Sequence, residues 1–145
     1  MKKVKNSKPK VFFNASVILA GLRSSGGGSG KVIGWAKNGK IDGVISEVIV
    51  DEIMCRCHKV GLTPRQAAGQ ITPFFNISPA PAAEAVEQYT RIVKDFGDRH
   101  VLAGAQENKC RYLVSLDKKH LLALRKKIKR FRILSPGQLI ESLSK

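Results

Sequence analysis

The sequence has few acidic residues, few cysteines and no long apolar run, and each shortage narrows what the chain is expected to do. Only 11 aspartates and glutamates stand against 26 lysines and arginines. The three cysteines are an odd number, which is typical of reduced thiols in a cytoplasm rather than of a disulfide framework. No apolar segment approaches the roughly 20 residues of a membrane span. We therefore expect a cytoplasmic protein that does not associate with a membrane.

The excess of positive charge predicts a polyanionic partner. The formal net charge is +15 at pH 7, and self-repulsion at that level destabilises a compact chain unless a partner offsets it. RNA or DNA is the leading candidate, and the alternative is that surface lysines serve solubility alone. The first ten residues carry five lysines and no acid. We expect residues 1–10 to form a flexible basic tail and residues 11–145 to form one domain.

Short apolar segments alternate with helical patterns along the chain, which predicts a parallel α/β sheet. The expected strands span residues 11–13, 41–45, 112–116 and 131–134. The expected helices span residues 16–22, 32–37, 46–60, 63–71, 82–93, 98–105 and 137–143, with one more after the third strand. Residues 23–30 are rich in glycine and serine but lack the Gly-Lys-Ser/Thr ending of a phosphate-binding loop, so we expect a flexible loop there.

Two acidic residues stand where helices and strands of this sheet are expected to begin or end. Asp98 opens a helix behind Gly97, and Asp117 directly follows the strand at residues 112–116. In parallel sheets, the polar groups that do chemistry gather beyond the carboxyl ends of the strands. Converging carboxylates suggest a divalent metal ion. Taken alone, however, an aspartate at a helix start is also explained as a simple N-cap.

The pairing of these acids resembles a motif of the PIN domain family. That family has an acid at a helix start and then Ser/Thr-x-Asp after the next strand, which here are Asp98 and Ser115-Leu116-Asp117. The family also opens with a strand that ends in an aspartate, followed by x-Ser/Asn and an apolar helix. This chain has Asn14-Ala15-Ser16 at that place. Position and context match, but an amide replaces the acid.

Two further features extend the resemblance over nearly the whole chain. PIN domains carry a glutamate on the helix after the second strand, and Glu52 fits that position. They also close with a strand, a Ser/Thr-Pro turn and a short helix, as residues 131–143 do here. The resemblance implies a three-layer fold with a parallel sheet of four or five strands and helices on both faces. The chain is similar to the VapC-like toxins, whose family activity is metal-dependent cleavage of RNA.

The resemblance also implies a set of site residues. Mg²⁺ or Mn²⁺ would be held by the catalytic side chains Asn14, Glu52, Asp98 and Asp117, supported through hydrogen bonds by Ser16 and Ser115. The dense positive charge of an acid-free segment, and not the resemblance, predicts which residues bind RNA, namely Lys118, Lys119, Arg125, Lys126, Lys127, Lys129 and Arg130. A homodimer and a cognate antitoxin are the expected protein partners.

The amide at position 14 leaves two functions open. A metal-dependent endoribonuclease of toxin–antitoxin type would be weakened or inactive with Asn14, because one ligand charge is missing. The alternative is a catalytically inactive PIN-like module that binds RNA or protein. Other classes fit less well, since haloacid-dehalogenase-like phosphatases and receiver domains both need acids where Asn14-Ala15-Ser16 stands. A zinc site at Cys55-Arg56-Cys57-His58 is disfavoured because residues two apart on a helix diverge.

Overall fold

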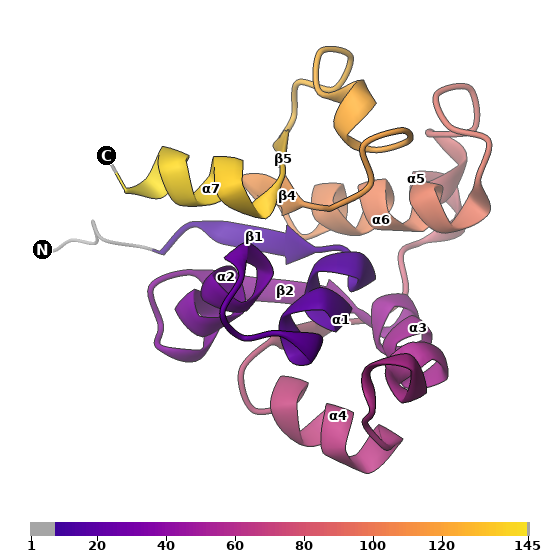
Figure 1. The fold of residues 1–145 in the computed structure, drawn as a ribbon. Coiled ribbons are helices and arrows are strands. Elements are labelled where there is room, and N and C mark those ends of the chain that lie inside the picture. Colours follow the sequence, from indigo (N-terminus) through magenta and orange to yellow (C-terminus); the bar gives the residue numbers. More distant parts are fainter. Residues whose placement is uncertain (1–7, 145) are drawn as a thin grey trace, which may run out of the picture.

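Five parallel strands form a single sheet at the centre of the computed structural model, which describes residues 8–144. Their order is β3-β2-β1-β4-β5, and every neighbouring pair is parallel. The strands are β1 (Lys10–Phe13), β2 (Asp42–Ser46), β3 (Asn76–Ser78), β4 (Tyr112–Val114) and β5 (Arg132–Leu134). The prediction of a parallel sheet with four or five strands is confirmed (Figure 1).

The central strand β1 is apolar because both of its faces are covered. Val11, Phe12 and Phe13 have no exposed surface, as expected for a strand in the middle of a parallel sheet. Phe12 lies beside Val44 of β2 on one side and Leu113 of β4 on the other. This register brings the carboxyl ends of the three strands to the same edge of the sheet.

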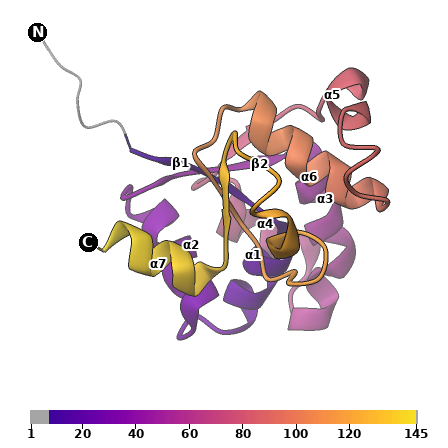
Figure 2. The same cartoon turned by 90° about the horizontal axis from the view of Figure 1, so that it is seen from above.

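Seven α-helices and two 3-10 helices cover the sheet over residues 8–144. Their bounds are α1 (Ala15–Arg23), α2 (Gly28–Lys37), α3 (Glu47–Arg56), α4 (Pro64–Ile71), α5 (Ala83–Glu87), α6 (Phe96–Glu107), α7 (Pro136–Leu143), η1 (Cys57–Val60) and η2 (Leu122–Leu124). In Figure 2, α5 and α6 lie on one side of the strands, and α1, α2 and α7 lie on the other. Helix α6 packs on β1 and β4, while α2 packs between α1 and α7.

The starts of α3, α4 and α7 and the end of η1 follow the local signals of the sequence. The Ser46 hydroxyl caps α3 by accepting the N–H of Ile49. Thr63 and Ser135 each form a complete capping box, followed by a proline in the first turn. Gly61 ends η1 with a φ of 79°, a conformation that glycine adopts without steric cost. These capping arrangements fix the helix starts independently of the rest of the fold.

Several element boundaries differ from those predicted. Helix α2 begins at Gly28, inside the segment expected to be a loop. A Cβ on Gly30 would lie 2.4 Å from the Ser25 carbonyl oxygen, so the missing side chain is what lets this segment coil so tightly. Strand β3 is absent from the prediction, because it is a short edge strand with mostly exposed residues and no apolar pattern. The helix predicted over residues 46–60 is α3 followed by η1.

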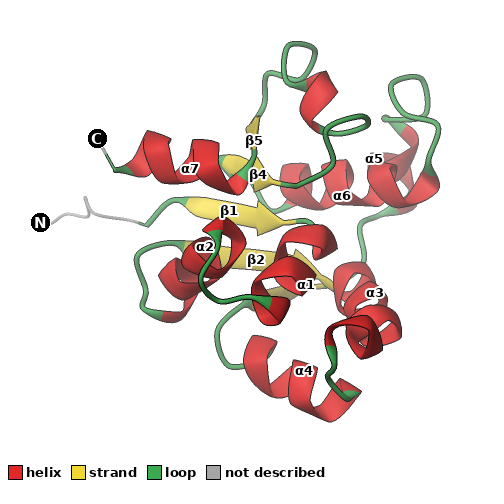
Figure 3. Cartoon of the chain, viewed as in Figure 1, coloured by secondary structure: helices red, strands yellow, loops and turns green. Residues whose placement is uncertain are grey.

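Two expected helices are shorter than predicted or absent. The helix predicted over residues 82–93 ends at Glu87 and continues as turns. Beyond Asp117 the chain forms turns and the three-residue helix η2 instead of an α-helix (Figure 3). A continuous helix would place like charges four residues apart, for example Lys126 with Arg130, and such pairs destabilise helices. Strand β4 also ends at Val114, two residues before the predicted end.

Three smaller expectations concern the termini, the thiols and the membrane. Residues 1–7 of the predicted tail lie outside the described residues, and Lys10 is already part of β1. All three cysteines are free; Cys55 is exposed whereas Cys57 is buried, so the two side chains point apart. Among residues 8–144, no helix combines the length and the apolar character needed to cross a membrane.

We predict that substituting Gly104 with alanine destabilises the fold. A Cβ at this position of α6 would lie 2.6 Å from Cζ of Phe12, which is completely buried. Overpacking of this kind costs about 1–3 kcal/mol. Gly69→Ala is the matched control, because a Cβ on this exposed residue of α4 meets nothing within 4 Å. The control should be stabilised by up to about 1 kcal/mol. Thermal unfolding of both variants is the measurement, and equal stability would contradict the packing described.

Candidate active site

A cavity of about 340 Å³ opens where the carboxyl ends of the central strands meet the start of α6. Its polar lining comes from several elements and consists of Asn14, Ser16, Glu52, Arg56, Asp95, Asp98 and Asp117. The four side chains predicted to hold a metal ion are therefore brought to one pocket. They come from four separate parts of the chain, namely the end of β1, α3, α6 and the turn after β4.

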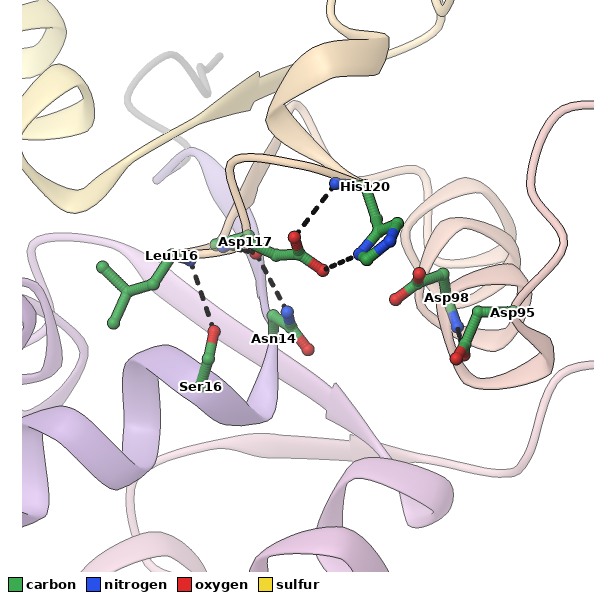
Figure 4. A network of polar contacts seen from close by, with 8 residues as sticks. Asn14, Ser16, Asp95, Asp98, Leu116, Asp117 and His120 are labelled. Carbon is green, nitrogen blue, oxygen red and sulfur yellow. Dashed lines mark hydrogen bonds and ion pairs between the residues drawn. The ribbon is translucent and has the colours of Figure 1, made fainter.

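Asn14 is held at the end of β1 by the backbone and side chain of the neighbouring strand. Its N–H donates to the carbonyl oxygen of Val114 at 3.0 Å. Its side-chain Nδ2 donates to Oγ of Ser115 at 2.9 Å, and the Asn14 residue is only 9% exposed. Figure 4 shows the other side-chain atom, Oδ1, on the side away from this hydrogen bond and toward Asp98. The amide therefore presents an oxygen, not a nitrogen, to the pocket.

The two serines fix the connection after β4. Ser115 is completely buried and accepts the N–H of Asp117 at 3.0 Å as well as the amide of Asn14. Ser16, at the start of α1, accepts the N–H of Leu116 at 3.3 Å and also lines the pocket. Neither serine bonds to a carboxylate. They hold the backbone that carries the acidic residues.

Asp98 lies within the first turn of α6 and does not open the helix. Helix α6 begins at Phe96, and its N-cap is Asp95, whose carboxylate accepts the N–H of Asp98 at 3.1 Å. The sequence predicts that Asp98 itself opens the helix, and this is wrong. Because Asp95 satisfies the helix end, the carboxylate of Asp98 accepts no hydrogen bond from any of residues 8–144. The Asp98 side chain is left free to face the pocket.

The pocket is crowded with negative charge. Partial burial, together with the negative charges of Asp95, Asp117 and Glu52, raises the pKa of Asp98 from 3.8 to about 6. Only His120 opposes the shift. A carboxylate whose pKa is raised by other carboxylates gains from a nearby cation. The electrostatics of the pocket therefore match the donor set, which consists of oxygen ligands that suit a hard divalent ion.

Glu52 has a weak competing contact. Nη1 of Arg56 lies 3.8 Å from Oε2 of Glu52, one helical turn away, and both side chains are partly exposed. Exposed pairs of this kind contribute less than about 1 kcal/mol. Arg56 also lines the pocket, so it places one positive charge at the rim among the acids. The pair does not prevent Glu52 from acting as a ligand.

His120 is a site residue that the sequence patterns do not predict. One ligand atom each from Asp98, Asp117 and His120 lie within 4.8 Å of one another. His120 follows Asp117 by three residues, in a turn where the sequence predicts a helix. The available signal is the histidine close behind the Ser115-Leu116-Asp117 motif. His120 lies near Asp98 and Asp117 because the chain turns after Asp117.

The basic residues predicted to contact RNA all lie on the surface. They are Lys118, Lys119, Arg125, Lys126, Lys127, Lys129 and Arg130. They belong to the loop-rich segment between β4 and β5, drawn in orange in the upper part of Figure 1. Among residues 8–144, none of these seven side chains forms an ion pair with a carboxylate. Arg125 alone is anchored, through hydrogen bonds to Leu122 and Gln138.

Solved structures with the same architecture share little sequence with this chain. VapBC2 of Rickettsia felis, bound to a DNA fragment from its promoter, is 13% identical, with a TM-score of 0.60 over 86% of this chain and 96% of that one. FitAB bound to the IR36 DNA fragment is 16% identical, with a TM-score of 0.60 over 87% and 94%.

VapC20 of Mycobacterium tuberculosis, described as a toxin that cleaves the sarcin–ricin loop, is 14% identical. Its TM-score is 0.55, over 84% of this chain and 98% of that one. At these identities the likeness shows the fold. No curated protein matches the chain by sequence.

A family model described as a PIN domain matches residues 10–119. The matched region runs from the first residue of β1 past Asp117, so it contains every element that lines the pocket. This match confirms the resemblance found in the sequence: the chain belongs to the PIN domain family.

Proposed function

We propose that the protein is a metal-dependent endoribonuclease of toxin–antitoxin type, weakened as it stands because Asn14 replaces an aspartate. The observation that carries the proposal is the convergence of Asn14, Glu52, Asp98 and Asp117 in one pocket of a PIN domain. The similarity in fold to VapC20, a toxin described as cleaving the sarcin–ricin loop, supports the substrate class.

The residue types suit the hydrolysis of a phosphodiester. Bound Mg²⁺ or Mn²⁺ would neutralise the phosphate charge, lower the pKa of an attacking water and stabilise the leaving oxygen. Glu52, Asp98 and Asp117 would hold the ion with their carboxylates, and Asn14 would contribute its Oδ1. Asp98 is the strongest candidate among them, because its carboxylate accepts no hydrogen bond from residues 8–144 and is repelled by its neighbours.

Ser115 positions two of these four residues, Asn14 and Asp117. It accepts hydrogen bonds from the Asn14 amide and from the backbone of Asp117, so the hydroxyl proton of Ser115 remains available to donate. An aspartate at position 14 would accept a hydrogen bond from the Ser115 hydroxyl. The site is therefore built to take a carboxylate at position 14 without rearrangement.

RNA would lie across the basic surface between β4 and β5 and enter the pocket. The exposed lysines and arginines of residues 118–130 have no acidic partners among residues 8–144. Phosphates would relieve their mutual repulsion. Lys118 and Lys119 follow Asp117 directly, so the basic surface begins at the edge of the pocket.

The protein partners are proposed by analogy. The VapBC2 and FitAB structures are DNA-bound complexes, and VapC20 is described as a toxin. By analogy, this chain would act in the cytoplasm as a homodimer and be inhibited by a cognate antitoxin. The amide at position 14 also favours a second function, in which a catalytically inactive PIN domain binds RNA or a protein.

We predict that Asn14→Asp increases both Mn²⁺ affinity and cleavage of a mixed RNA pool by at least tenfold. At an effective dielectric constant near 20, a carboxylate beside an ion contributes on the order of several kcal/mol before its own desolvation is subtracted. A remainder of about 1.4 kcal/mol already corresponds to a tenfold change. Calorimetric titration with Mn²⁺ and a gel-based cleavage assay are the measurements.

Asn38→Asp is the matched control for this substitution. Asn38 is exposed at the end of α2 and is not among the residues that line the pocket. It adds the same charge without affecting the site. Equal Mn²⁺ affinity of Asn14→Asp and the unmodified protein would show that position 14 does not bind the ion. Inactivity of both proteins would favour the binding module.

We predict that Asp98→Asn raises the melting temperature by a few degrees above pH 6 when no metal is present. The pKa of Asp98 is raised to about 6 in the folded protein, from an ordinary value of 3.8. Well below pH 3.8 the group is protonated in both states and contributes nothing, and its cost develops as the pH rises toward 6. Above pH 6 the folded state carries the full cost of the charge, and the amide removes that cost. Melting curves from pH 4 to pH 8 in a chelator test this.

Adding metal should reduce the stability advantage of Asp98→Asn over the unmodified protein. Because the substitution removes a proposed ligand, Mn²⁺ should stabilise Asp98→Asn less than it stabilises the unmodified protein. A melting temperature that does not depend on Asp98 at any pH would show that the crowding of charge at Asp98 is relieved by solvent.

We predict that reversing the charges of Lys126 and Lys127 to glutamate weakens RNA binding at low salt. For single-stranded RNA, each phosphate that the protein no longer neutralises should reduce the salt dependence of the binding constant by about 0.7 on a double-logarithmic plot. The control reverses Lys59 and Arg65, two exposed residues of η1 and α4, which produces the same change in net charge. If both pairs weaken binding equally, the effect of net charge alone would explain it.

A further inference from the structure

His120 is held beside the acidic pocket by two contacts with Asp117. Its backbone N–H donates to Oδ1 of Asp117 at 3.0 Å, and its Nδ1 lies 3.3 Å from Oδ2 of the same carboxylate. The imidazole side chain is 60% exposed. Figure 4 shows the ring between Asp117 and Asp98. The turn after β4 therefore directs a nitrogen ligand toward the two aspartates.

The separation of these groups fits a shared ion. One ligand atom from each of Asp98, Asp117 and His120 lie within 4.8 Å of one another. Two ligand atoms that bind one small divalent ion at about 2.1 Å are at most about 4.2 Å apart. The 4.8 Å limit exceeds that distance by only a fraction of an ångström. Nδ1 of His120 already lies 3.3 Å from Oδ2 of Asp117, and the exposed imidazole has room to adjust.

We propose that His120 is a metal ligand, and that the site consequently binds Mn²⁺ and Co²⁺ in preference to Mg²⁺. This inference rests on the metal site of the proposed function and specifies which ion the site takes. Mg²⁺ takes oxygen ligands and gives up its waters reluctantly. An imidazole nitrogen instead favours the first-row transition ions, with affinity increasing from Mn²⁺ to Co²⁺.

The residue at position 14 strengthens the same preference. Asn14 offers a neutral oxygen where a carboxylate would add a charge. Mg²⁺ binding depends most on charged oxygen ligands, whereas an ion that accepts nitrogen gains covalency from His120. The absence of one carboxylate and the presence of one imidazole therefore both shift the site away from Mg²⁺.

The test is a titration of the full chain with Mg²⁺, Mn²⁺ and Co²⁺ at constant pH, followed by calorimetry and, for Co²⁺, by its visible absorption. We expect the unmodified protein to bind Mn²⁺ at least tenfold more tightly than Mg²⁺. His120→Ala should weaken Mn²⁺ and Co²⁺ binding about tenfold or more, the range found when groups at a metal site are removed. It should also alter the Co²⁺ spectrum and weaken Mg²⁺ binding by less than about twofold.

His58→Ala is the matched control, because His58 is an exposed histidine of η1 that does not line the pocket. It should leave all three affinities and the Co²⁺ spectrum unchanged. Equal weakening of all three ions by His120→Ala, or none, overturns the assignment of His120 as a ligand and leaves the proposed nuclease site standing. If the unmodified protein and Asn14→Asp both bind none of the ions, the metal site fails and the inference fails with it. Melting curves without metal establish that the variants are folded.

Discussion

The pairing of β1 with β4 determines the geometry of the site, and the hydroxyl of Ser115 completes it. The backbone of Asn14 donates to Val114, and its amide donates to Ser115, which also accepts the N–H of Asp117. The bonds of Asn14 join residues that are far apart in the sequence and set the distance between two ligand positions. Ser115 is completely buried, so water does not compete for these bonds. Removing one partner would leave a buried polar group unsatisfied, which costs about 1–3 kcal/mol.

The parts of the fold and site that the sequence predicts are those set by short-range patterns. Buried strands such as β1 appear as apolar runs because both faces are covered. The starts of α3 and α4 follow from Ser46 and Thr63, which satisfy helix donors within their own turn. Glu52 could be placed because it lies a fixed distance along one of these helices. Each of these inferences needs only a few neighbouring residues.

The parts that could not be predicted depend on tertiary contacts. Strand β3 has no apolar pattern of its own and exists because it pairs with β2. The predicted start of α6 is wrong because both Asp95 and Asp98 are good capping residues, and the sequence does not show which one the fold uses. His120 joins the pocket because the chain turns after Asp117, where the sequence predicts an α-helix. In each case a local preference is close to neutral and packing decides the outcome.

The distribution of charge explains how one small domain can hold an acidic pocket and a strongly basic surface. Acids that share the pocket raise the pKa of Asp98, so each additional carboxylate costs stability until a cation arrives. An amide at position 14 lowers that cost and, by the same reasoning, weakens the attraction for the cation. The basic residues between β4 and β5 have no such internal compensation over residues 8–144. In the proposed complex, a phosphate backbone neutralises the surface while the ion neutralises the pocket. The metal ion and the RNA would then promote each other's binding. Lys118 and Lys119 adjoin Asp117, so the bound ion and the bound phosphates would lie beside each other.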